Sequence, residues 1–113
     1  MKILIAGARN IEEFDLSKCV PDDAELIISG GAKGVDTLAE RYADRRKISK
    51  LIMRPSYARY GKGAPLIRNK KMVELADTVI IIWDGKSRGT KFTLDYAKSI
   101  KKNIVLININ DID

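Results

Sequence analysis

Two glycine-rich stretches, each lying between an apolar run and a helical pattern, carry the strongest chemical signal in this sequence. The first reads SGGAKGVD over residues 29 to 36, and the second reads DGKSRGT over residues 84 to 90. A strand that breaks into glycines and restarts as a helix leaves backbone N–H groups unpaired at the positive end of the helix dipole, where phosphate and carboxylate groups bind. Two such loops predict one crevice that holds an anion.

The side chains in these loops suggest how the anion would be held. Neither loop has the G-x-G-x-x-G or the G-x-x-x-x-G-K-[ST] spacing, which argues against dinucleotide dehydrogenases and P-loop NTPases. Lys33 and the loop amides would meet the negative charge. Asp36 falls in the first turn of its helix, where it either caps that helix or accepts hydrogen bonds from sugar hydroxyls. Both roles of Asp36 are open at this point.

A basic segment from residue 54 to residue 71 adds a second chemical signal. It holds six Lys and Arg side chains and no acidic one. Within it, Asn69 shares a helical stripe with Met72 and Val73 and should face the sheet, and Arg68 borders that stripe and reaches toward the crevice. Tyr57 and Tyr60 alternate with the basic residues, a pattern that either anchors a loop or stacks nucleic-acid bases.

Composition limits the chemistry that remains. Histidine is absent, which removes the commonest general base and metal ligand, so we expect no metal site and no cofactor. Cys19 is alone and is expected to be a packing residue. The net charge of +6 arises after residue 53, which favours an anionic partner. No apolar run approaches the roughly 18 residues that span a bilayer, so we expect a cytoplasmic protein without a membrane partner.

The elements that would position these residues alternate regularly along the 113 residues. Apolar, β-branched runs lie at 3–6, 26–28, 51–53, 79–83 and 104–109, and helical spacing appears at 35–46, 65–76, 90–102 and, more weakly, 10–19. This order predicts a single α/β domain, Rossmann-like, with a parallel five-stranded sheet between helices. Ligands of such sheets bind beyond the carboxyl ends of the strands, where all the glycine loops fall. The longest irregular stretch is expected at 57–65.

Three motifs in order resemble one known group of proteins. They are the SGGAKGVD loop, then Tyr60 to Pro65 (YGKGAP) with Arg68 to Met72 (RNKKM), and then Trp83 to Thr90 (WDGKSRGT). Together they are similar to the SLOG superfamily, which includes the DNA-processing protein Smf (DprA) and the Lonely Guy phosphoribohydrolases, and most of all to its small YpsA-related branch. The resemblance runs from Ile3 to Leu106. It implies a Rossmann-like sheet that binds a nucleotide or a nucleotide-derived ligand through Gly30, Gly31, Gly34, Gly85, Gly89 and Thr90.

The resemblance leaves catalysis undecided. The Lonely Guy enzymes carry P-G-G-x-G-T-x-x-E, in which the glutamate is catalytic and works with an arginine from the preceding helix. Gly89, Thr90 and Arg68 match this pattern, but Thr93 stands at the glutamate position. A hydroxyl cannot supply the charge of a carboxylate to an oxocarbenium-like transition state. Catalysis would therefore need Arg68 together with Asp36, Asp84 or Asp95.

Our leading hypothesis is a protein that binds or senses a phosphate-bearing nucleotide. The alternatives are a hydrolase of nucleotide N-glycosidic bonds and a single-strand nucleic-acid binder that uses residues 54–71. We also expect a homo-oligomer. The predicted ligand-binding residues are Gly7, Arg9, Ser29, Gly30, Gly31, Lys33, Gly34, Asp36, Arg68, Asn69, Asp84, Gly85, Ser87, Gly89 and Thr90.

Overall fold

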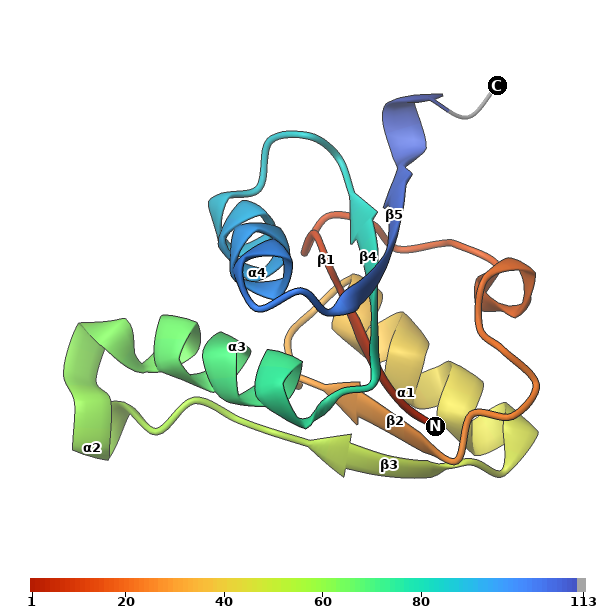
Figure 1. Cartoon of the computed structure of the whole chain (residues 1–113), viewed down its shortest axis with the longest axis horizontal. Helices are drawn as coiled ribbons and strands as arrows, with labels where there is room; N and C mark the ends of the chain where they lie inside the picture. Colours follow the sequence, from red (N-terminus) through yellow and green to blue (C-terminus); the bar gives the residue numbers. More distant parts are fainter. Residues whose placement is uncertain (112–113) are drawn as a thin grey trace.

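A computed structural model describes residues 1–111 and contains one five-stranded sheet (Figure 1). Its strands are parallel throughout and lie in the order β3-β2-β1-β4-β5. The strands are β1 (Lys2–Gly7), β2 (Leu26–Ser29), β3 (Ser49–Ile52), β4 (Thr78–Trp83) and β5 (Asn103–Asn108). The helices are α1 (Val35–Arg46), α2 (Tyr57–Tyr60), α3 (Ala64–Leu75) and α4 (Arg88–Ser99), with 3-10 turns η1 (Leu16–Lys18), η2 (Gly61–Gly63) and η3 (Ile109–Asp111). The predicted α/β class and parallel sheet are confirmed.

The sheet forms because its central strands are apolar on both faces. Residues 79–82 of β4 and 3–5 of β1 are completely buried, as expected for parallel strands covered on both sides. One core cluster joins Ile3, Ile5 and Ile80 to α1, and the other joins Leu4 and Ile81 to α3 and α4. Helix α1 therefore covers one face, and α3 with α4 covers the other.

The strand order creates a switch point between β1 and β4. The chain moves outward from β1 through β2 to β3 on one side, and then crosses back to β4 and β5 on the other. Connections leave the two central strands in opposite directions, so a crevice opens between the loops at their carboxyl ends. These are the loops after Gly7 and Trp83, with the loop after Ser29 beside them.

Two local expectations are wrong. Residues 10–19 do not form an α-helix, because the Asp15 carboxylate accepts hydrogen bonds from the Ser17 amide and hydroxyl and closes a single turn, η1. The segment 57–65 is not irregular: the Ser56 carbonyl accepts from the Arg59 and Tyr60 amides and starts α2, which leads through η2 into α3.

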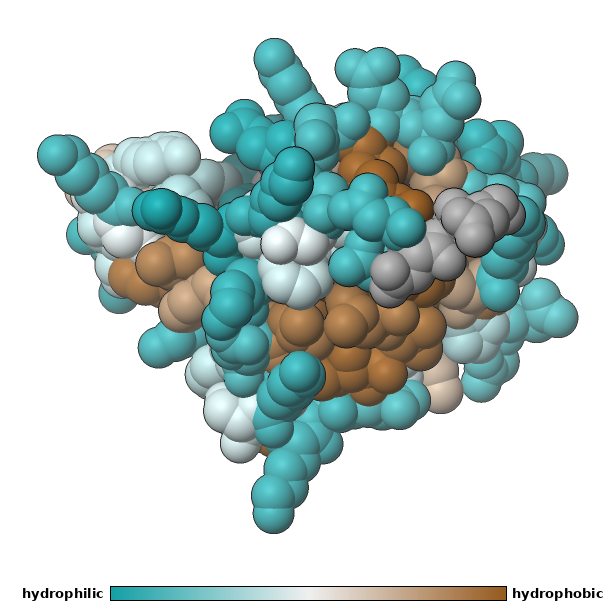
Figure 2. All heavy atoms as spheres, turned by 90° about the horizontal axis from the view of Figure 1, so that it is seen from above, coloured by the Kyte–Doolittle hydropathy of each residue, from teal (hydrophilic) through white to brown (hydrophobic). Residues whose placement is uncertain are grey.

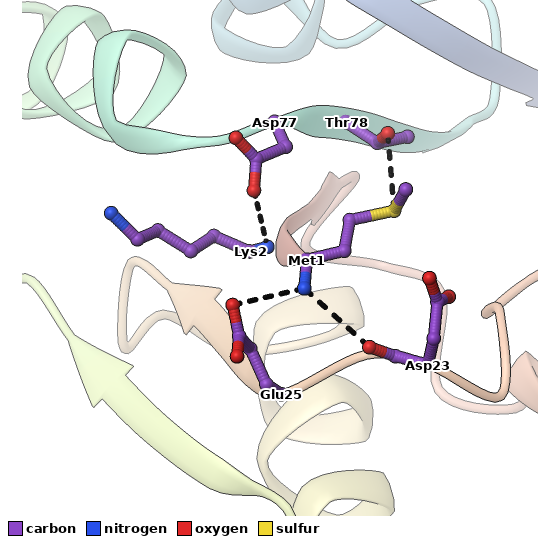
Figure 3. A network of polar contacts seen from close by, with 6 residues as sticks. All are labelled: Met1, Lys2, Asp23, Glu25, Asp77 and Thr78. Atoms are coloured by element: carbon purple, nitrogen blue, oxygen red, sulfur yellow. Dashed lines mark hydrogen bonds and ion pairs between the residues drawn. The ribbon is translucent and has the colours of Figure 1, made fainter.

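The opposite end of the sheet is held together by polar contacts (Figure 3). The Met1 amine lies 3.0 Å from Glu25 Oε1, and the Lys2 amide donates to Asp77 Oδ2 at 2.7 Å. The Asp77 amide in turn donates to the Lys2 carbonyl at 2.8 Å. These bonds join the starts of β1, β2 and β4, far from the loops at the carboxyl ends.

No helix within residues 1–111 has the length and apolar character needed to cross a bilayer. Over the same range, no three His, Cys, Asp or Glu side chains are grouped so that they would hold a metal ion.

Candidate functional site

The glycine-rich loops converge on a cavity of about 560 Å³ at the carboxyl end of β1. This volume is within the range of small-molecule sites, which is roughly 300 to 1,000 Å³. The loops after β1, β2, β3 and β4 all contribute, together with residues of α1, α3 and α4. The lining residues are Ala6, Gly7, Arg9, Gly30, Gly31, Ala32, Asp36, Arg54, Pro55, Tyr57, Pro65, Leu66, Arg68, Asn69, Met72, Ser87, Gly89, Thr90 and Thr93.

The loop between β2 and α1 is folded around Asp36. The Asp36 carboxylate accepts a hydrogen bond from the Ala32 amide at 3.0 Å, and its backbone carbonyl accepts from the Ser29 hydroxyl at 3.3 Å. The Ser29 hydroxyl also accepts from the Gly31 amide at 3.3 Å. Asp36 thus closes its own loop as well as facing the cavity, so part of its hydrogen-bonding capacity is used within the protein.

Gly34 is required by the packing of the protein itself. Its φ is +73°, and a Cβ there would lie 2.4 Å from the Ala8 carbonyl oxygen and 2.5 Å from that of Arg9. Only glycine permits both this backbone conformation and this close approach. The residue therefore joins the start of α1 to the loop after β1, and it does not line the cavity.

Arg68 and Arg54 hold the same loop from the outside. One Arg68 nitrogen, Nη1, donates to the Gly30 carbonyl at 2.6 Å and to the Met53 carbonyl at 3.2 Å, while Nε donates to Asn69 Oδ1 at 2.7 Å. Arg54 Nη1 donates to the Gly31 carbonyl at 3.1 Å. The Gly30 and Gly31 carbonyls thus accept hydrogen bonds from Arg68 and Arg54, and these bonds hold both guanidinium groups at the cavity wall.

The loop between β4 and α4 is arranged differently. Asp84 accepts hydrogen bonds from the Lys86 and Ser87 amides at 2.9 and 3.0 Å, and the Ser87 hydroxyl accepts from the Thr90 amide at 3.4 Å. Within residues 1–111, the amides of Arg88 and Gly89 donate to no protein acceptor. Because these are first-turn N–H groups of a 12-residue helix, the open end of α4 presents partial positive charge at the cavity.

Electrostatics at the cavity favour an anion. Arg9, Arg54 and Arg68 line it, and the acidic side chain among the lining residues is Asp36. Within residues 1–111, no carboxylate oxygen lies within 4 Å of the Arg68 guanidinium. Burial raises the pKa of Asp36, against the opposing effects of the Ala32 amide and of Arg68, and burial lowers the pKa of Arg68.

One wall of the cavity is apolar. Pro55 and Tyr57 approach from the α2 side, and Pro65, Leu66 and Met72 from α3. The Tyr57 side chain is 61% exposed, and Leu66 is 41% exposed. A cavity with cations and helix amides at one part and flat or aliphatic groups at another suits a ligand that is charged at one end and apolar at the other.

The structure brings most of the predicted residues together, but not all. The predicted residues that line the cavity are Gly7, Arg9, Gly30, Gly31, Asp36, Arg68, Asn69, Ser87, Gly89 and Thr90. The predicted residues that lie outside it are Ser29, Lys33, Gly34, Asp84, Gly85 and Asp95. Ser29 is buried beneath the loop, and Asp95 pairs with Lys91 on the surface at 2.8 Å. Of the aspartates considered for catalysis, only Asp36 faces the cavity.

Sequence reasoning did not assign Arg54, Tyr57, Pro65, Leu66, Met72 and Thr93 to this crevice. Arg54 follows the carboxyl end of β3, so its place in the chain was a usable signal. The Thr93 hydroxyl donates to the Gly89 carbonyl at 3.1 Å, which ties it to its own helix.

Comparisons with known proteins give one relative. No protein-family model matches the chain, and no solved structure matches it. The Gene 61 protein of Mycobacterium phage D29 is 30% identical over 92 residues, an alignment that covers 76% of this chain and 72% of the phage protein. The chain belongs to the family of this phage Gene 61 protein.

Proposed function

We propose that the protein binds a nucleotide or a nucleotide-derived phosphate compound in the cavity at the carboxyl ends of the strands. The observation that carries this proposal is the convergence of three arginines and the open N-terminus of α4 on one cavity. A phosphate accepts hydrogen bonds from both kinds of donor, and the helix dipole adds to the attraction. Membership of the SLOG superfamily is part of the same proposal.

The other features of the cavity fit the remainder of a nucleotide. Asp36 supplies a carboxylate oxygen for sugar hydroxyls, and Asn69 supplies an amide group in the same cavity. The Tyr57 ring and the aliphatic side chains of Leu66 and Met72 supply the apolar contact that a base requires. In this proposal Asp36 both closes its loop and contacts the ligand.

The proposal is tested by substituting Gly89, whose Cβ position has no neighbour within 4 Å. An aspartate there lies in the first turn of α4, where the helix dipole favours it by roughly 0.3 to 1 kcal/mol, so the variant should fold. Its carboxylate would occupy the space of the bound anion. We expect mononucleotides, dinucleotides or ADP-ribose to raise the melting temperature of the wild type, and Gly89→Asp to abolish the rise.

Gly63→Asp is the matched control, since Gly63 also has no neighbour near its Cβ position and lies outside the cavity. It should keep the ligand-induced rise. Unphosphorylated nucleosides in the same panel show how much of the rise in melting temperature depends on the phosphate group. A melting temperature that no phosphorylated compound changes would refute the proposal.

A second function is favoured by one observation. Asp36 is 8% exposed, its pKa is raised by burial, and it shares the cavity with Arg68, an arrangement typical of a catalytic acid. Hydrolysis of a nucleotide N-glycosidic bond would then release free base, detectable by chromatography, and Asp36→Asn should stop it. Equal base release by wild type and variant would exclude Asp36 as the catalytic acid, and no release by either would leave binding without hydrolysis.

A further inference from the structure

A second groove, of about 630 Å³, lies between the loop after β1 and the end of β5. Its apolar lining comes from Ile11, Phe14, Ile107 and Ile109, and its acidic lining from Glu12, Glu13 and Asp15, with Asn10 and Lys18 completing the set. The three acidic residues are exposed. Within the described residues, no Lys or Arg nitrogen lies within 4 Å of their carboxylates. The groove is therefore both apolar and negatively charged.

The groove exists because one face of the sheet is incompletely covered. Helix α1 packs on β1, β2 and β3, whereas the same face of β5 is bordered by the loop that carries η1. Val105 and Ile107 point to this face and remain partly exposed. Figure 2 shows that hydrophobic residues gather into a patch on the surface seen from above. Apolar surface of this kind marks sites of association.

A positively charged surface lies on a projection that we call the α2 lobe, residues 54–63. It contains Arg54, Arg59 and Lys62 and no acidic side chain, and its Tyr57 is the most exposed large apolar group of the described residues. Figure 1 shows α2 at one end of the molecule and the loop that carries η1 toward the other. The lobe of one molecule thus cannot occupy its own groove.

We propose that the acidic groove receives the α2 lobe of a second copy of this chain. Arg59 and Lys62 would face Glu12 and Glu13, and Tyr57 would cover the apolar floor, so a bound base and a second copy would compete for this ring. Tyr and Arg are the residue types that contribute most to interfaces. Charge complementarity also speeds encounter and selects the partner.

This pairing has a definite symmetry. Groove against groove would oppose six carboxylates, and lobe against lobe would oppose six cations, so neither patch pairs with itself. Each contact joins two different surfaces, which makes the assembly head-to-tail. Such contacts form rings if the rotation between copies closes, and open filaments if it does not.

The test is sedimentation velocity of the full chain, from about 10 µM to about 1 mM protein, a range that detects weak association. We expect the mean mass to rise with concentration at about 0.05 M salt and to fall toward the monomer at about 0.5 M salt, where charges are screened within a few ångströms. Glu12→Lys/Glu13→Lys and Arg59→Glu/Lys62→Glu should each sediment as monomers. An equal mixture of the two variants should associate again, because the intact lobe of one meets the intact groove of the other.

The controls separate this proposal from the cavity and from misfolding. All four substituted residues are exposed and lie outside the cavity, so both variants should keep the wild-type melting temperature and its response to nucleotide. Lys98→Glu/Lys101→Glu makes the same charge change as the lobe variant at exposed residues elsewhere, and should associate like the wild type. A wild type that is monomeric throughout, or a mixture that stays monomeric, overturns the proposal. So does a monomer whose lobe instead binds a single-stranded oligonucleotide.

Discussion

The two glycine-rich loops look alike in sequence but differ in what occupies them. In the loop 29–36, Gly30 and Gly31 are covered by the guanidinium groups of Arg68 and Arg54, and Gly34 lies against the backbone of the loop after β1. In the loop 84–90, no atom beyond its chain neighbours and the backbone of its own helix lies within 4 Å of the Cβ position of Gly89. The first loop is filled by the protein, and the second is open to the cavity.

This difference separates two reasons for a glycine. At Gly34 the fold itself forbids a side chain, because both the backbone angle and the neighbouring carbonyls exclude it. At Gly89 neither reason applies, and glycine in the first turn of a helix costs stability relative to alanine. The folded chain itself thus gives no packing reason for glycine at position 89.

The largest effect on stability is expected from adding a side chain at Gly34, in the loop 29–36. Gly34→Ala places a methyl group 2.4 Å from the Ala8 carbonyl oxygen at a φ of +73°, and should destabilise the protein by about 3 kcal/mol or more. For a domain of this size that lowers the melting temperature by about 10 °C, measurable by calorimetry. If the free energy of unfolding fell by less than about 0.5 kcal/mol, the loop would relax freely around the methyl group, and Gly34 and Gly89 would not differ as described.

An intermediate effect should appear in the pH dependence of the two loops. The Asp36 pKa is raised by burial, so the native state holds its proton more tightly than the unfolded state. Its contribution to stability therefore falls as pH rises from 3.8 through the native pKa. The Asp84 pKa is lowered by the Lys86 and Ser87 amides, so its contribution is present above 3.8 and is lost as pH falls through the native pKa.

Thermal unfolding across the acidic range distinguishes the two carboxylates. The melting temperature of the wild type minus that of Asp36→Asn should decrease with rising pH and then level off. The corresponding difference for Asp84→Asn should decrease with falling pH. Slopes of the same sign would mean that the two loops do not differ in burial as described.

The smallest effect on stability, and of the opposite sign, is expected at Gly89. Gly89→Ala should raise the free energy of unfolding by about 0.5 kcal/mol, because alanine is the better helix former and its methyl group meets no neighbour. The same methyl group enters the cavity, so nucleotide affinity should fall by about tenfold, or 1.4 kcal/mol. If Gly89→Ala destabilised the protein as much as Gly34→Ala, the two loops would not differ in the space around their glycines.

Much of the fold was predictable because its strands are continuous apolar runs. Val79 to Trp83 has no alternation and many β-branched residues, which identifies a buried parallel strand. The helix at 35–46 was predicted with the bounds that the structure gives. The turn at Leu16–Lys18 was not, because it depends on one Asp15 side chain that competes with helical hydrogen bonding.

The candidate site was predictable in outline for a topological reason. Parallel strands place their carboxyl ends on one edge, so loops that follow strands must meet there. The sequence cannot show which loop residues face inward, and Ser29, Lys33 and Asp84 have the right types but lie outside the cavity. Arg54 and Tyr57 also line the cavity, in the connection that follows the carboxyl end of β3; their position after a strand was a signal, but which side chains of that connection face inward depends on tertiary packing.

The two bonds from Arg68 Nη1 connect three parts of the molecule, since Gly30 follows β2, Met53 follows β3 and Arg68 itself belongs to α3. The other terminal nitrogen of Arg68, Nη2, makes no hydrogen bond within residues 1–111, so an anion could accept from it while both carbonyl bonds persist. Helix α3 and the ends of β2 and β3 would then stay joined, and one side chain would serve both the framework and the cavity.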